Sequence, residues 1–103
     1  MQKYNFTEFL ASMAKLDHDE ILRRADAECD LVERRSYGRK GAVREREFGS
    51  SEYAEQIKAF LFFMRSGSRP YGASDEDFQN YRPVVEALVQ KGQIKPETLS
   101  AFS

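Results

Sequence analysis

Few side chains in this chain of 103 residues could act as nucleophile, base or metal ligand, because it contains one histidine and one cysteine. His18 and Cys29 fall on one expected helix, and their spacing separates them by roughly 16 Å at 1.5 Å per residue. A nucleophile and its base must lie within hydrogen-bond reach of each other. We therefore expect no Cys–His active site, no enzymatic activity and no cofactor. Cys29 falls on an apolar stripe, which is typical of a small core residue.

Acidic side chains recur along one face of the same expected helix, at Asp19, Asp26, Asp30 and Glu33. Carboxylate oxygens are ligands for divalent cations, so an ion site built from carboxylates alone is one interpretation of this face. A site that uses imidazole would need more than one histidine, and His18 has no second histidine to join it. We favour a solvent-exposed acidic face, and we expect no bound metal.

Charge is segregated between two adjacent segments, although the chain as a whole has a net charge of only -1. Residues 17–33 hold seven acidic and two basic residues, whereas residues 34–46 hold six basic residues and one acidic residue. The basic segment consists of Arg34, Arg35, Arg39, Lys40, Arg44 and Arg46, with Tyr37 among them. Arginine forms bidentate contacts with carboxylates and phosphates and stacks on planar rings. The segment is a candidate for contact with an acidic protein or a nucleic acid; a solvated loop is the alternative.

A second unusual feature is the run Phe60–Met64, where an otherwise amphipathic helix is apolar on all sides. At 100° per residue, Phe62 points away from the expected core face and Phe63 lies at its edge. One interpretation places this helix at the centre of the fold, covered on both sides. The other makes Phe62 and Phe63 an apolar anchor for a protein partner or for self-association. The burial of Phe62 distinguishes the two interpretations.

The apolar residues that must position these features recur at helical spacing, and we find no convincing strand. The connection over Ser36–Ser50 is a functional loop, a disordered loop or a short strand. We expect helices from Asn5 or Thr7 to Leu16, from His18 to Arg35, from Ser50 or Ser51 to Gly67, from Ser74 to Gly92, and from Pro96 onward. Pro83 interrupts the fourth of these, and the apolar stripe that continues across it favours a kink over a separate first helix. The turn at residues 66–72 could hold an anion, but it matches no phosphate-binding motif.

Expected core positions follow from the same spacing. They are Phe6, Phe9, Leu10 and Met13; Leu22, Ala25, Cys29 and Val32; Tyr53, Ile57, Phe60, Leu61 and Met64; Phe78, Tyr81, Val85, Leu88 and Val89; and Leu99 and Phe102. The sequence therefore predicts an all-α fold in one domain over residues 1–103. We expect a small bundle of four to five helices, with a long Gly/Arg-rich connection over Ser36–Ser50 between the second and third helices.

The composition excludes several other classes of protein. A single cysteine cannot build a disulfide scaffold, and no apolar run approaches the length of a membrane span. Met1–Phe6 lacks the basic start and apolar core of a secretory signal, so we expect a cytoplasmic location. Together these observations predict a small regulatory or adaptor protein that binds another protein through the basic segment and the Phe62–Phe63 patch. A nucleic-acid-binding module that uses the basic segment is the alternative, and no small-molecule substrate is inferred.

Overall fold

The computed structural model describes residues 4–37 and 49–102 of the chain, and helices are the only regular elements in those two ranges. The helices are α1 (Phe6–Met13), α2 (His18–Tyr37), α3 (Ser50–Ser66), α4 (Asp75–Asn80), α5 (Arg82–Gln90) and the 3-10 helix η1 (Pro96–Phe102). The predicted all-α fold is confirmed. Helix α2 continues two residues past its expected end at Arg35, and most of the Gly/Arg-rich connection lies outside the described residues.

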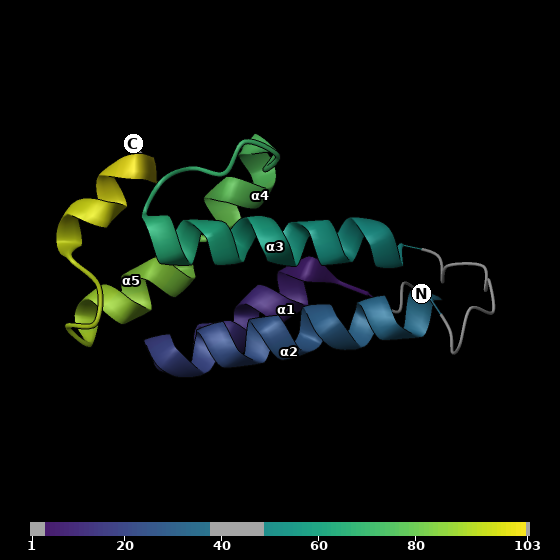
Figure 1. Cartoon of the computed structure of the whole chain (residues 1–103). Coiled ribbons are helices and arrows are strands. Elements are labelled where there is room, and N and C mark those ends of the chain that lie inside the picture. The colour runs from purple at the N-terminus through teal and green to yellow at the C-terminus, as the bar shows by residue number, and fades with distance from the viewer. Residues whose placement is uncertain (1–3, 38–48, 103) are drawn as a thin grey trace.

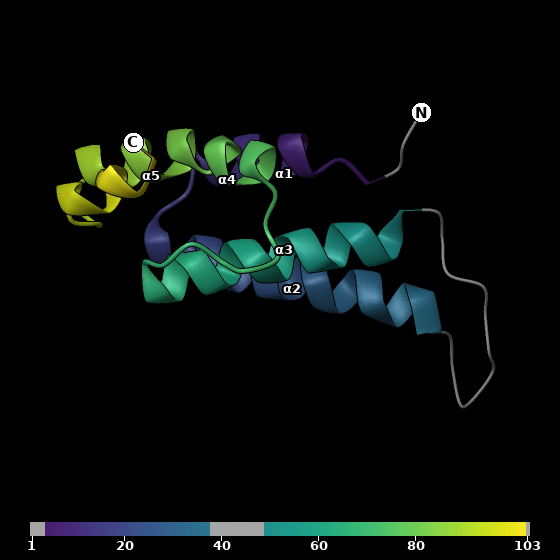
Figure 2. The ribbon, with the colours of Figure 1, turned by 90° about the horizontal axis from the view of Figure 1, so that it is seen from above.

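The helices form two layers, which are seen most clearly in Figure 2. Helices α2 and α3 run antiparallel and side by side along one layer, and they share the largest interface in the fold (Figure 1). The second layer contains α1, α4, α5 and η1, and it covers one face of the α2–α3 pair. In the described part of the chain, nothing covers the opposite face of that pair. None of the described helices combines the length and the apolar character needed to cross a membrane.

Side-chain caps and glycine stops define several helix ends as expected. The Asn5 side chain accepts a hydrogen bond from the backbone N–H of Glu8 at 3.1 Å, and Ser74 caps α4 through the N–H of Asp77 at the same distance. Gly67 and Gly92 both have a φ of 74°, the left-handed conformation that glycine adopts without steric cost. These four signals act locally, so they do not depend on how the layers pack.

The start of α3 differs from the expectation that Ser50 or Ser51 caps it. Gly49 is the residue before the helix, with a φ of 80° and no side chain to form a cap. Ser50 lies inside the first turn and is fully buried. The left-handed turn at Gly49 brings the chain into the helix one residue early, and it places the Ser50 side chain in the interior rather than at the cap position.

Pro83 separates two helices instead of kinking one. Helix α4 ends at Asn80 and α5 begins at Arg82, so the proline occupies the first turn of the second helix, where its missing N–H costs nothing. Tyr81 between them keeps a helical conformation, with a φ of -70° and a ψ of -24°. The apolar stripe therefore remains continuous across the break, although the favoured kink was wrong.

The core lies between the layers and is rich in aromatic rings. In α2 the buried residues are Ile21, Ala25, Cys29 and Val32. Leu22 is only partly buried, so the expected stripe began one residue late. In α3 all five expected core residues are buried, and Ala54 and Phe63 join them. Leu99 and Val89 pack at the margin of the core, while Phe102 of η1 is buried within it.

Candidate protein-binding surface

Phe62 and Phe63 are adjacent in α3 but lie on different sides of the helix. Phe62 is 52% exposed, whereas Phe63 is 1% exposed. The ring of Phe63 packs 5.4 Å from Phe78 and 5.6 Å from Phe102, measured between ring centroids. The 100° turn between the two residues carries Phe63 into the second layer and Phe62 out of it. The described part of the chain therefore does not cover both sides of α3, and the surface contains Phe62 without Phe63.

Phe62 borders a surface groove of about 510 Å³ between α2 and α3. The groove is lined by Asp26, Cys29, Asp30 and Glu33 from α2 and by Lys58, Leu61, Phe62, Arg65 and Ser66 from α3. The apolar side chains in this lining are the buried Cys29 and Leu61 and the exposed Phe62. Charged side chains stand on both walls, so the groove combines an apolar floor with a polar rim.

Two ion pairs bridge the walls of the groove on either side of Phe62. Lys58 Nζ lies 2.5 Å from Glu33 Oε1, and an Arg65 guanidinium nitrogen lies 2.6 Å from Asp26 Oδ2. The hydrogen bond to Glu33 raises the pKa of Lys58 above its ordinary value. Exposed pairs of this kind add little to stability. They place two cations beside an apolar ring, a combination that is also found at the centre and rim of protein interfaces.

Cys29 belongs to the core, as its place on the stripe predicted. Its side chain is buried, and its sulfur lies 3.9 Å from both the Ala54 carbonyl oxygen and Glu33 Oε1. Burial raises the pKa of the thiol, and the neighbouring Glu33 carboxylate raises it further. The neutral thiol is therefore the stable form, and a thiol held neutral is a poor nucleophile.

On the acidic face of α2, Asp26 and Glu33 are paired with cations of α3. In the described ranges, the structure assembles no group of three or more histidine, cysteine or carboxylate side chains that could hold a metal ion. His18 at the start of α2 has its Nδ1 atom 3.8 Å from Asp19 Oδ1. The face therefore presents carboxylates that are separated along the helix.

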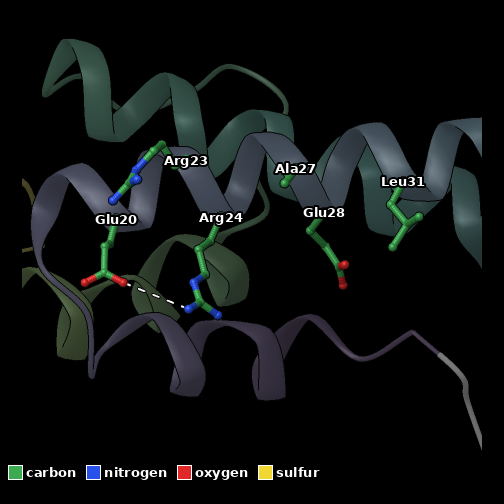
Figure 3. Close-up of a pocket in the computed structure, with 6 residues that line it drawn as sticks. All are labelled: Glu20, Arg23, Arg24, Ala27, Glu28 and Leu31. Carbon is green, nitrogen blue, oxygen red and sulfur yellow. Dashed lines mark ion pairs between the residues drawn. The ribbon is translucent and has the colours of Figure 1, made fainter.

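A second groove, of about 440 Å³, runs along α2 on its other side and was not anticipated from the sequence. Figure 3 shows its lining residues, Glu20, Arg23, Arg24, Ala27, Glu28 and Leu31. The dashed line joins Arg24 to Glu20, 4.0 Å apart. Leu31 is 44% exposed and is the one large apolar side chain in this lining. Single exposed leucines are ordinary on protein surfaces, so Leu31 serves as a reference against which Phe62 can be compared.

The turn at residues 66–72 presents a fully exposed aromatic ring, that of Tyr71. The sequence analysis did not predict this exposed ring. The loop is held on both sides of this tip. Pro70 is buried, and Arg69 lies over the Phe78 ring at 4.9 Å while pairing with Asp75. Because Arg69 is engaged in this way, the suggested anion contact at the turn would have to compete with Asp75.

The basic segment is only partly within the described residues. The backbone of Arg34, Arg35 and Tyr37 forms the end of α2, while Arg39, Lys40, Arg44 and Arg46 lie outside the described residues. Phe62 lies twelve residues into α3, roughly 18 Å from the end of the α2–α3 pair where the basic segment begins. The two predicted parts of the binding surface therefore start from different positions along the pair.

Comparison with protein-family models, with curated proteins and with solved structures found no match to this chain.

Proposed function

We propose that the protein is a small cytoplasmic adaptor that binds another protein through the groove between α2 and α3, with Phe62 as its apolar anchor. The observation that carries this proposal is the half-exposed ring of Phe62 beside the apolar floor of that groove. Aromatic side chains dominate binding energy at interfaces when they enter a pocket and lose water. The action would be recruitment or occlusion of the partner, without chemical turnover.

The charged rim supports the proposal because it can select a partner. Lys58 and Arg65 flank Phe62 and are already positioned by their ion pairs with α2. Charges at the rim of an interface mainly set specificity and the rate of association. The basic segment that follows α2 would extend this selection toward acidic partners, which remains a prediction from the sequence.

Affinity capture from cell extract with matched baits tests the proposal. The baits are the unchanged protein, Phe62→Glu and Leu31→Glu, the last of which places the same charge at a similarly exposed apolar residue in the other groove. We expect the unchanged protein and Leu31→Glu to retain the same partner and Phe62→Glu to lose it. If all three baits retained the same set of proteins, the groove would not be the binding surface.

Nucleic acid is the alternative partner for the basic segment, and a separate measurement tests it. Labelled protein is titrated with single- and double-stranded oligonucleotides at low and moderate salt, and amide shifts are followed by NMR. Phosphate contacts by Arg34–Arg46 would give shifts in that segment that fade as salt rises, because binding releases counterions. An unchanged spectrum at low salt would remove this alternative.

A further inference from the structure

We infer that the occupant of the Phe62 surface is a second copy of this chain, paired antiparallel through the outer stripe of α3. The stripe consists of Glu55, Lys58, Phe62 and Arg65. This inference rests on the proposed function, since it names the partner of the same surface. It is carried by the order of charges along the stripe, which is complementary to itself when one copy is reversed.

The four residues share one face of α3. At 100° per residue their side chains lie within roughly 80° of one another around the helix. All four are exposed. Lys58 and Arg65 are paired with residues of α2, and Glu55 and Lys58 also border a groove whose other wall is the segment from Pro70 to Asp77. Ala59 lies beside them and is partly exposed. Its small side chain lines a groove with Pro70, Gly72 and Ala73.

A two-fold axis that passes Phe60 aligns every member of the stripe with a complementary one. Glu55 and Arg65 stand five residues before and after this point, and Lys58 and Phe62 stand two residues before and after it. Reversing one copy therefore sets Glu55 opposite Arg65 of the second copy. The same operation sets Lys58 against the ring of the second copy's Phe62, a cation–π arrangement. Each contact occurs twice, as an interface with two-fold symmetry requires.

The stripe residues already form ion pairs within one chain, and the pairing must share them. Lys58 Nζ lies 2.5 Å from Glu33 Oε1 and 3.6 Å from Glu55 Oε1. Arg65 bonds to Asp26 through one guanidinium nitrogen, and a guanidinium has five N–H donors, so it can accept a second carboxylate. The two-fold axis places α2 of both copies on the same side of the α3 pair. Asp26 and Glu33 on that side are each paired with a cation, which limits the repulsion between the two acidic helices.

The other two exposed large apolar residues in the described part of the chain, Leu31 and Tyr71, lack this pattern. The Leu31 groove presents Arg23 and Arg24 beside Glu20 and Glu28. Its lining contains one small residue, Ala27, and no aromatic ring. The Tyr71 tip is a single protruding ring on a short loop, which gives no extended face for a second helix. Among these three residues, Phe62 is therefore the one that stands on an extended helix face between charged residues of both signs.

Sedimentation equilibrium of the full chain measures the association directly. We expect a monomer–dimer equilibrium at concentrations up to about 1 mM, the range that detects a weak contact. Phe62→Glu should raise the dissociation constant roughly 30-fold or more, as loss of an interface anchor does. Leu31→Glu should leave the dissociation constant unchanged. A monomer throughout this range, or a dimer that Phe62→Glu does not weaken, would overturn the inference.

Charge exchange tests the register of the pairing. Glu55→Arg alone and Arg65→Glu alone each place like charges opposite one another, so each variant should be more monomeric than the unchanged protein. Mixing the two variants should restore association, because both contacts between positions 55 and 65 in the mixed dimer are again between opposite charges. Circular dichroism of each variant confirms that the helices are intact. Failure of the mixture to associate more strongly than either variant alone would exclude this register.

Thiol cross-linking provides a second measurement, in a Cys29→Ala background. Ala59→Cys lies next to the two-fold axis and should yield a covalent dimer with a short bifunctional maleimide. Ser51→Cys lies on the same face but roughly 27 Å from its symmetry mate along the helix axis, and it should yield no covalent dimer.

If the chain proves monomeric while Phe62→Glu still loses a captured partner, the adaptor proposal stands and the dimer fails. If the dimer forms through the stripe but Phe62→Glu does not change which other proteins are captured, the dimer stands and the adaptor proposal fails.

Discussion

His18 donates its backbone N–H to the side-chain oxygen of Gln93 over 2.8 Å, across 75 positions of the chain. The amide nitrogen of Gln93 in turn donates to Asp17 Oδ1 at 3.2 Å. Lys91 Nζ reaches the Leu16 carbonyl oxygen at 3.2 Å. Gln93 of the second layer therefore accepts a hydrogen bond from the first backbone N–H of α2, the role that an N-cap side chain usually performs. This contact fastens the α2–α3 pair to the end of α5.

Replacing Gln93 should destabilise the fold by the amount typical of a lost helix cap. We expect Gln93→Ala to lower the free energy of unfolding by about 1 kcal/mol, because an N–H of α2 loses its acceptor and the layers lose a tie. Gln90→Ala, an exposed glutamine at the end of α5, is the matched control and should change stability by less than about 0.5 kcal/mol. Urea unfolding measures both. Equal effects of the two substitutions would show that the contact contributes nothing.

The two buried tyrosines differ in whether their hydroxyl groups are satisfied. Tyr53 Oη donates to Glu28 Oε2 at 2.8 Å, whereas the Tyr81 hydroxyl has no hydrogen-bond partner among the described residues. Tyr53→Phe should therefore cost about 1 kcal/mol of stability, and Tyr81→Phe should be neutral or stabilising, because it removes an unsatisfied buried group. Thermal unfolding of the two variants gives the comparison. A loss of stability in Tyr81→Phe as large as in Tyr53→Phe would reveal a partner for its hydroxyl.

The same tyrosines predict a loss of stability in alkali. Burial raises the pKa of Tyr53 above the ordinary value of 10.0, and the hydrogen bond to Glu28 raises it further. Burial also raises the pKa of Tyr81, and the negative charge of the nearby Asp77 adds to this shift. Above pH 10 the unfolded chain ionises these groups while the folded chain keeps its protons. The free energy of unfolding should then fall with a slope that approaches about 1.4 kcal/mol per pH unit for each tyrosine as the pH rises above 10. The double variant with phenylalanine at both positions should show a shallower fall in urea titrations between pH 9 and 11.

Local signals allowed much of this fold to be predicted. Asn5, Ser74, Gly67 and Gly92 mark helix ends through atoms within a few residues of themselves, so the sequence contains all the information needed. Helical spacing likewise identified the core face of α3. The entry to α3 was missed because Gly49 supplies it through backbone conformation, without a side-chain cap.

The candidate surface was harder to predict because it depends on which helices cover which face. The rotation of 100° per residue placed Phe63 at the edge of the core face of α3. Its burial is decided by Phe78 and Phe102, which come from later segments of the chain. The exposure of Phe62 follows from the same arrangement, since the segments that cover Phe63 leave Phe62 half exposed. Gln93 could not be foreseen as a cap for α2, because the contact joins opposite ends of the sequence.

Gly67 and Gly72 lie in the same loop but differ in what they contribute. Gly67 has a φ of 74° and ends α3 through its N–H bond to the Phe63 carbonyl oxygen at 2.8 Å, whereas Gly72 has no left-handed φ. A Cβ at either position would meet no atom within 4 Å, so sterics with neighbours do not distinguish them. Gly67→Ala should cost about 1 kcal/mol for the left-handed conformation, and Gly72→Ala should be neutral or slightly stabilising. Chemical unfolding of the two variants would contradict this account if their midpoints were the same.

Phe62 and Phe63 should separate folding from binding when each is replaced by leucine. Phe63→Leu removes edge-to-face contacts with Phe78 and Phe102 from the core and should lower the free energy of unfolding by about 1.5 kcal/mol. Phe62→Leu, at a half-exposed position, should change it by less than about 0.5 kcal/mol. Urea unfolding at micromolar protein concentration keeps self-association from contributing. A large loss for Phe62→Leu under these conditions would mean that its ring stabilises the monomer itself, and its role as an anchor for a partner would no longer follow from its exposure.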